Sequence, residues 1–178
     1  MLNRDLADIL PAYRLEYASK EIYPDIFRVE QTNPDYFLLE QEEPITLESC
    51  IAGLNPLPPG TSSSQKHCLC LYRDTVPIAI LDYVEGYPDP QTVYIGFFML
   101  NGNFHRQGFG REIISSFQQA ARKNRFERIE LGVIAENEKG LAFWTSMGFR
   151  EIRRVERKRE NGNKQHLISM ELSFIHQD

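Results

Sequence analysis

Apolar residues recur along the chain in two periods, one typical of strands and one typical of helices. Runs that are continuously apolar, or that alternate with polar residues, predict seven strands, because the side chains of a strand point to opposite faces in turn. The predicted strands cover residues 13–17, 67–72, 77–84, 93–100, 129–133, 151–158 and 165–172. The run Tyr94–Leu100 is apolar on both faces and predicts a central strand that is covered on both sides.

The helical period predicts two helices in the C-terminal half. The first begins near Phe109, and its apolar face carries Phe109, Ile113 and Phe117. The second covers residues 138–147, with Gly148 as its left-handed terminating residue. Three shorter helices are expected nearer the N-terminus, where residues that favour a first helical turn occur. These residues are Pro24, Asn33, Pro34 and Thr46.

This order of elements predicts a fold class. An N-terminal half with strands and helices is followed by three strands, a loop, a helix, a strand, a helix and a hairpin with its turn at Asn161–Gly162. We therefore expect an α/β fold with a mixed central sheet of six to seven strands and helices on both faces. The length of 178 residues suits one domain, and the loop at residues 55–64 is too short to separate two. We expect a single domain over residues 1–178.

The net charge of the chain restricts which classes of molecule it can bind. A net charge of -5 argues against nucleic acid, which requires a broad basic surface. Residues 150–160 are a local exception with six basic side chains. They form either a solvated strand face or a contact to an acidic partner or a nucleotide phosphate.

Composition also indicates the compartment. The N-terminus lacks the apolar stretch of a signal peptide, and no apolar run is long enough to span a membrane, so we expect a cytoplasmic protein without membrane contact. The three cysteines are then reduced thiols. Cys68 and Cys70 lie on one side of a predicted strand, and Cys50 stands alone, so we expect no metal site.

Candidate chemistry begins between the central strand and the helix that follows it. The segment His105–Arg111 contains Gly108 and Gly110, which let the backbone approach an anion closely because they carry no Cβ. The first turn of the next helix presents unpaired N–H groups, and these favour negative charge together with the helix dipole. Arg106 and Arg111 add positive charge. The pattern predicts a cradle for a phosphorylated ligand.

Two motifs together resemble the GNAT superfamily of acyl-CoA-dependent N-acyltransferases. The first is the strand end and glycine loop Leu100–Gly110, which is similar to the family's Arg/Gln-x-x-Gly-x-Gly/Ala loop. The second is Asn137–Phe149, which is similar to the family pattern of Asn, then Phe-Tyr or Phe-Trp, then Gly-Phe. The resemblance extends from Tyr13 to Leu172 and is strongest over residues 94–149.

The resemblance implies acetyl-CoA as co-substrate. Its pyrophosphate would bind the backbone N–H groups of Arg106–Arg111, and Asn137 would help to hold its pantetheine arm. The arm would lie beside a central strand that splays from its neighbour. The residues implied for coenzyme binding are Phe98, Met99, Leu100, His105, Arg106, Gln107, Gly108, Phe109, Gly110, Arg111, Asn137, Phe143 and Trp144.

Two positions depart from the commoner family pattern. The Arg/Gln position is His105, with Arg106 one place later, and this change leaves the backbone donors in place. Where many members carry a tyrosine placed to protonate the departing thiolate, this chain has Trp144. An indole N–H donates a hydrogen bond but delivers no proton, so Trp144 either bonds the sulfur or forms a wall of the channel. A thiol pKa of about 8.5 lets the sulfur leave as a thiolate with modest help.

The implied reaction is direct attack of a neutral amine on the thioester. We expect the backbone N–H of Phe98 to stabilise the carbonyl oxygen. Glu85 is the first choice of general base, because it follows a predicted strand beside the expected splay, and Asp82 and Tyr94 are further candidates. The catalytic set is Glu85, Trp144 and Phe98. A cysteine nucleophile is not expected, because no cysteine has an acid–base partner nearby in sequence.

The acceptor pocket is expected between the N-terminal helices and the turn at Gly86. Its predicted lining residues are Asp35, Tyr36, Phe37, Glu85, Tyr87 and Tyr94. An acidic rim would attract a cationic amine, which is a small molecule or a peptide of unidentified structure. A non-catalytic acyl-CoA-binding sensor of the same fold is the alternative. A Rossmann dinucleotide enzyme fits less well, because the third glycine of its fingerprint is missing. The oligomeric state is open between monomer and homodimer.

Overall fold

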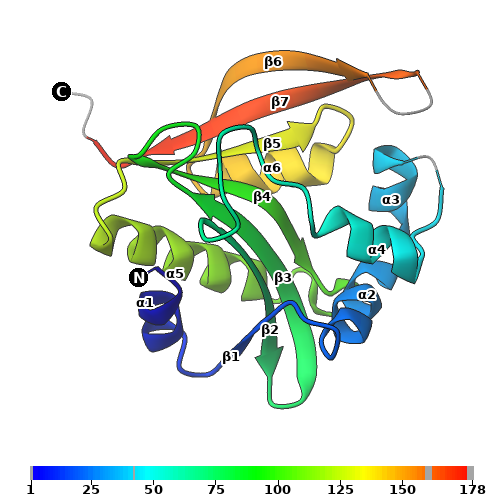
Figure 1. Ribbon diagram of the computed structural model, residues 1–178, viewed down its shortest axis with the longest axis horizontal. Helices are drawn as coiled ribbons and strands as arrows, with labels where there is room; N and C mark the ends of the chain where they lie inside the picture. The colour runs from blue at the N-terminus through cyan, green and yellow to red at the C-terminus, as the bar shows by residue number, and fades with distance from the viewer. Residues whose placement is uncertain (1, 42, 159–161, 176–178) are drawn as a thin grey trace.

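The computed structural model describes residues 2–41, 43–158 and 162–175. Its centre is a seven-stranded mixed sheet in the order β1-β2-β3-β4-β5-β7-β6 (Figure 1). The strands are β1 (Arg14–Tyr17), β2 (Lys66–Arg73), β3 (Val76–Glu85), β4 (Thr92–Leu100), β5 (Arg128–Ile134), β6 (Arg150–Lys158) and β7 (Lys164–Ser173). β4 and β5 pair in parallel, and the other neighbouring strands pair antiparallel. The expected α/β fold class is confirmed.

Helices cover both faces of this sheet, with a separate core under each layer. One layer contains α1 (Leu2–Ile9), α5 (Phe109–Lys123) and α6 (Glu138–Ser146), and the other contains α2 (Tyr23–Gln31), α3 (Pro34–Glu40) and α4 (Leu47–Gly53). A short 3-10 helix, Gly102–Phe104, follows β4. Phe117 in the first core and Ile26 in the second are fully buried. Cys68 and Cys70 are buried on the α2 side of β2, as expected.

Most predicted elements are confirmed to within a few residues, and α1 is the main difference. Leu2 and Leu6 are fully buried on α1, which packs against α5 (Figure 1). Their spacing of four is helical, but eight residues give a weak signal unless a partner helix covers them. Thr46 caps α4, where its side-chain oxygen accepts a hydrogen bond from the N–H of Ser49. Of the predicted hairpin turn, Asn161 lies outside the described residues.

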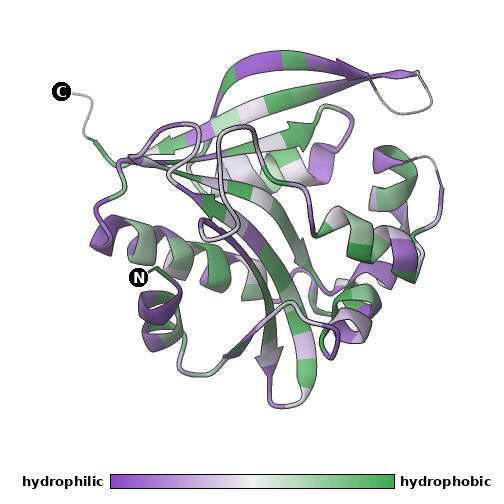
Figure 2. Cartoon of the chain, in the orientation of Figure 1, coloured by the Kyte–Doolittle hydropathy of each residue, from purple (hydrophilic) through white to green (hydrophobic). Residues whose placement is uncertain are grey.

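The described part of the basic run, residues 150–158, forms a largely exposed strand face, and Arg159 and Glu160 lie outside the described residues. Residues of β6 are exposed with one exception, Arg157, and Figure 2 shows much of this strand in the purple of hydrophilic residues. Acidic neighbours compensate part of the charge, since Arg154 pairs with Glu151 and Lys164 pairs with Glu156. Among the described helices, none is long and apolar enough to cross a membrane.

Candidate functional site

The parallel pair β4–β5 separates halfway along its length. The described partners run from Thr92 with Arg128 to Ile95 with Leu131, whereas β4 continues to Leu100 paired only with β3. A strand with one neighbour presents alternate N–H and C=O groups along its free edge. β4 therefore offers main-chain hydrogen-bonding groups to a ligand in the gap. The gap also explains why the central strand is less covered than its apolar sequence predicts.

A bulge in β4 marks the start of this gap. Asp82 pairs with Phe97 and the next residue of β3 pairs with Ile95, so Gly96 is the extra residue. A Cβ added at Gly96 would lie 3.0 Å from Oδ1 of Asp82. The glycine thus lets the Asp82 carboxylate rest directly against the bulged backbone.

The glycine loop lies after the end of β4 and leads into α5. Gly108 has a φ of +91°, in the left-handed region that favours glycine, and a Cβ there would meet no atom within 4 Å. The N–H groups of residues 106–111 donate to no atom in the described part of the chain. Donors without partners at the start of a helix are a fitting site for a phosphate group. The loop has the geometry that its sequence predicts.

The side chains of this loop are held by nearby elements. Nε2 of His105 lies 3.2 Å from the carbonyl oxygen of Leu100, to which the protonated nitrogen donates. Arg111 extends toward α6, where its Nη2 lies 3.3 Å from Oγ of Ser146. Gln107 donates to the carbonyl oxygen of Asn103. These hydrogen bonds hold the loop in one conformation, which lowers the entropy cost of ligand binding.

An aromatic wall closes the gap on the α6 side. Phe98 stacks on Phe143 with ring centroids 6.0 Å apart, and Trp144 approaches Phe98 edge-on at 5.9 Å. Trp144 is 8% exposed and lines the cavity described below. Asn137 also lines this cavity, and its side-chain oxygen caps α6 by accepting from the N–H of Gly140. These four residues lie together, as the sequence predicts.

Two residues at the end of β4 that were expected to bind the coenzyme make other contacts. Met99 is buried in the core under α2, away from the gap. The carbonyl oxygen of Leu100 already accepts a hydrogen bond from Nδ2 of Asn33 at 3.0 Å. This bond ties the turn between α2 and α3 to the end of β4, so the N-terminal helices are fixed beside the gap.

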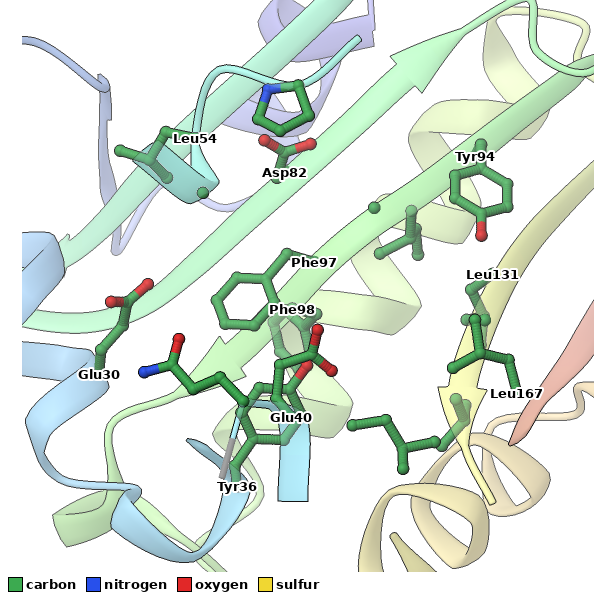
Figure 3. A pocket seen from close by; sticks show the side chains of 18 of the residues that line it. Glu30, Tyr36, Glu40, Leu54, Asp82, Tyr94, Phe97, Phe98, Leu131 and Leu167 are labelled. Carbon is green, nitrogen blue, oxygen red and sulfur yellow. The ribbon is translucent and has the colours of Figure 1, made fainter. Parts of the chain in front are cut away.

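A cavity of about 610 Å³ extends from the gap to the layer of α2, α3 and α4 (Figure 3). That volume is in the range of small-molecule sites. Five charged side chains line it: Glu30, Glu40, Lys66, Asp82 and Arg157. Nζ of Lys66 lies 2.9 Å from Oδ2 of Asp82, and Arg157 pairs with Glu40.

Glu30 is the unusual acid of this cavity. It is 4% exposed, and its Oε2 has no hydrogen-bond partner in the described part of the chain. Burial raises the pKa of Glu30 to about 6, although the Cys50 thiol donates a hydrogen bond that opposes the rise. Its carboxylate points toward the interior of the cavity (Figure 3).

Asp82 is buried to the same extent but has a counter-charge. Burial raises the pKa of its carboxyl, while the hydrogen bond and charge of Lys66 lower it in part. Figure 3 shows Asp82 on the β3 side of the cavity, with Tyr94 on β4 and Leu131 on β5, where these two strands still pair. Burial also raises the pKa of Tyr94, which favours the protonated phenol and makes Tyr94 a less suitable base.

The structure separates Glu85 from the cavity. Oε1 of Glu85 lies 3.2 Å from Nε2 of His67, and neither residue is among those that line the cavity. The reason is the alternation of a strand: Asp82 and Val84 face the cavity, so Glu85 points to the opposite side, which α1 covers. The predicted base Glu85 therefore lies on the face of β3 opposite to the cavity.

The other predicted acceptor residues divide into two groups. Tyr36, Phe37 and Tyr94 line the cavity. Asp35 is exposed on α3, and Tyr87 packs edge-on against Tyr94 at 5.5 Å without reaching the cavity wall.

Several cavity residues have no assigned role in the sequence-based prediction. They are Glu30, Glu40, Lys66 and Arg157. Glu30 has a detectable signal, because it follows Val29 and lies four residues after Ile26, both on the buried face of α2. A charged residue on an apolar helix face is a candidate for function. The other three are recognisable only as spatial pairs.

We expect Glu30→Gln to stabilise the fold at neutral pH. The folded-state pKa of about 6 exceeds the ordinary value of 4.5, so the folded protein binds the proton more tightly than the unfolded chain. Stability is therefore lost as pH rises from 4.5 through 6, by about 2 kcal/mol for this shift. Urea denaturation at pH 8 should show the variant more stable by about that amount, with no difference at pH 4 or below. A less stable variant at pH 8 would contradict the unpaired state of Glu30.

Comparison with known proteins identifies the fold and the family. The model of the acetyltransferase (GNAT) family matches residues 21–149. No curated protein matches the sequence. An acetyltransferase from Thermus thermophilus is similar in structure, with 23% identity, a TM-score of 0.71, and coverage of 92% of this chain and 97% of that one.

Two further structures share the fold at lower identity. The ribosomal-protein-S18-alanine N-acetyltransferase of Escherichia coli has 15% identity and a TM-score of 0.65, over 93% of this chain and 97% of its own. The protein yncA of Salmonella typhimurium, in a structure with its cofactor acetyl-CoA, has 14% identity and a TM-score of 0.61, over 94% of this chain and 97% of its own. Because the family model covers well over half of the sequence, including the glycine loop and α6, the chain belongs to the GNAT family of acetyltransferases and is an acyltransferase.

Proposed function

We propose that this enzyme transfers an acetyl group from acetyl-CoA to a primary amine by direct attack within a ternary complex. The observation that carries the proposal is the separation of β4 from β5, with the glycine loop at one end and a cavity containing buried acids at the other. A thioester in this gap would meet the loop through its diphosphate and the cavity through its acyl group. The proposal treats residues 1–178 as one catalytic domain.

Coenzyme binding rests on the loop and the free edge of β4. The unpaired N–H groups of residues 106–111 and the N-terminus of α5 bind the diphosphate. The pantetheine arm lies along β4 beside Phe98, with Asn137 and the aromatic pair Phe143 and Trp144 on its other side. The side chain of Arg111, which contacts Ser146 on α6, is a further candidate to pair with a phosphate.

The chemical step needs three functions. The neutral amine attacks the thioester carbon, a C–N bond forms, the C–S bond breaks, and coenzyme A leaves as a thiolate. The backbone N–H of Phe98 stabilises the carbonyl oxygen as it gains negative charge. Asp82 accepts the amine proton, directly or through water. Trp144 walls the channel and offers its indole N–H to the sulfur.

Asp82 is the base that the geometry favours over Glu85. It rests against the bulge at Gly96, beside the carbonyl site, whereas Glu85 faces α1. Its carboxyl pKa is raised by burial, which makes it a better proton acceptor than an exposed aspartate. The cysteines are poor nucleophiles, because burial raises the pKa of Cys50, Cys68 and Cys70 and keeps them as thiols.

Initial-rate kinetics with acetyl-CoA and a panel of amines test the proposal. We expect amine-dependent thiol release, an acetylated product in the mass spectrum, and double-reciprocal plots that intersect, as a ternary complex requires. Parallel plots would indicate a covalent acyl-enzyme and contradict direct attack. Thermal stabilisation by acetyl-CoA without thiol release on any amine would instead favour the sensor function.

A further inference from the structure

The charges of the cavity do not balance. Its lining contains three carboxylates and two cations, and each cation is paired with a carboxylate, Lys66 with Asp82 and Arg157 with Glu40. Glu30 has no cation beside it in the described part of the chain. Its titratable neighbours are Cys50 on α4, Cys68 on β2 and Tyr36 on α3, which are neutral at pH 7.

An unpaired buried carboxylate lowers the stability of the fold. Packing does not require a carboxylate at position 30. Glu30 lies on the apolar face of α2, where a leucine or methionine would be accommodated without desolvating a charge. Its carboxylate is directed into the cavity (Figure 3), and its Oε2 lacks a donor among the described residues. A ligand with a positive charge supplies both the donor and the missing counter-charge.

The proposed base and Glu30 are on different sides of the cavity. Asp82 comes from β3 and Glu30 from α2, as Figure 3 shows. The wall in this part of the cavity is mainly apolar. It includes Tyr36, Phe37, Ile45, Leu54 and Phe97. Gln41 and Ser49 are polar members of the same lining. The apolar side chains suit a chain of methylene groups.

Resting on the proposed function, we infer that Glu30 binds a second, non-reacting ammonium group of the acceptor. The substrate class is then an aliphatic diamine or polyamine, in which one neutral amine reaches Asp82 and the thioester while a protonated amine pairs with Glu30. An ammonium donates up to three hydrogen bonds, and Tyr36 is a further acceptor near Glu30. Glu30 is a specificity residue in this scheme and takes no part in the chemical step.

The selectivity between matched amines tests the inference. The probes are diaminopropane, diaminobutane and diaminopentane, compared with propylamine, butylamine and pentylamine. We expect kcat/KM to favour a diamine over its matched monoamine, and Glu30→Gln to reduce this ratio roughly 10- to 100-fold, as for loss of one charge-assisted hydrogen bond. The change should appear mainly in KM. Glu48→Gln, an exposed acid of α4 outside the cavity, is the matched control and should leave the ratio unchanged.

Three other outcomes have distinct meanings. Equal activity on diamines and monoamines, with no effect of Glu30→Gln on the ratio, overturns the inference and leaves the acetyltransferase proposal intact. An equal fall in kcat for both kinds of amine would make Glu30 a base rather than a specificity residue, and also overturns it. No thiol release with any amine would contradict the proposed function itself.

Discussion

Asp82→Asn should reduce kcat by about 100- to 10,000-fold, the usual contribution of a positioned general base. The reason is geometric: the carboxylate rests against the β4 bulge and faces the cavity. Asparagine has almost the same shape but accepts no proton at neutral pH. Binding of acetyl-CoA, measured by calorimetry, should change little, because the loop and the edge of β4 are untouched.

Glu85→Gln is the matched control for Asp82→Asn. It removes one carboxylate from the same strand, three residues away and on the opposite face. We expect its kcat to stay near that of the unmodified enzyme. A large loss of rate in Glu85→Gln, with a mild effect of Asp82→Asn, would return the base to Glu85 and contradict the assignment made from the cavity.

The pH profile separates a catalytic from a structural effect of Asp82. A base works when deprotonated, so the rate of the unmodified enzyme should fall as pH drops through the pKa of Asp82. Burial raises that pKa, and Lys66, His67 and the Cys68 hydrogen bond oppose the rise. Asp82→Asn should lose this acid limb. If the limb survives with a lower rate throughout, Asp82 acts only by positioning Lys66.

Gly108→Glu should weaken binding of coenzyme A by at least about 100-fold. A side chain at a φ of +91° strains the loop, by roughly 1–2 kcal/mol. The new carboxylate would also stand in front of the N–H groups that we propose bind the diphosphate, and juxtaposed like charges cost several kcal/mol. The Kd for coenzyme A, measured by calorimetry, checks this.

A second glycine provides the control for backbone strain. Gly162 has a φ of +82° and, like Gly108, no atom within 4 Å of an added Cβ. Gly162→Glu imposes comparable strain in the hairpin of β6 and β7 and should leave the Kd for coenzyme A unchanged. Equal affinity of Gly108→Glu and the unmodified protein would contradict the phosphate cradle.

Local signals explain why most of the fold could be predicted. Strand and helix periods are properties of neighbouring residues, so β4 and α5 appear in the sequence nearly at their observed bounds. The glycine loop is likewise local, because its conformation at Gly108 depends on one residue type. α1 escaped prediction because its two buried leucines are covered by residues distant in the sequence, among them those of α5 more than a hundred residues later.

The proposed acceptor site shows which choices the sequence left open and why. A base at the end of β3 is a sound expectation, but the choice between Asp82 and Glu85 depends on which face of the strand meets the cavity. Both faces of β3 are buried, so polarity along the strand does not distinguish them. The orientation follows from α1 and α5 covering one face and α2 the other.

The sequence by itself determined the order of the elements after α1, the GNAT family and the conformation of the glycine loop, because each depends on residues close together in the chain. Only the tertiary structure decided which acids share the cavity and which of them is unpaired. Lys66 with Asp82 and Arg157 with Glu40 join residues from distant segments, and these pairs leave Glu30 without a counter-charge. The physical reason is that ion pairing and desolvation depend on distances in space, which local sequence patterns do not encode.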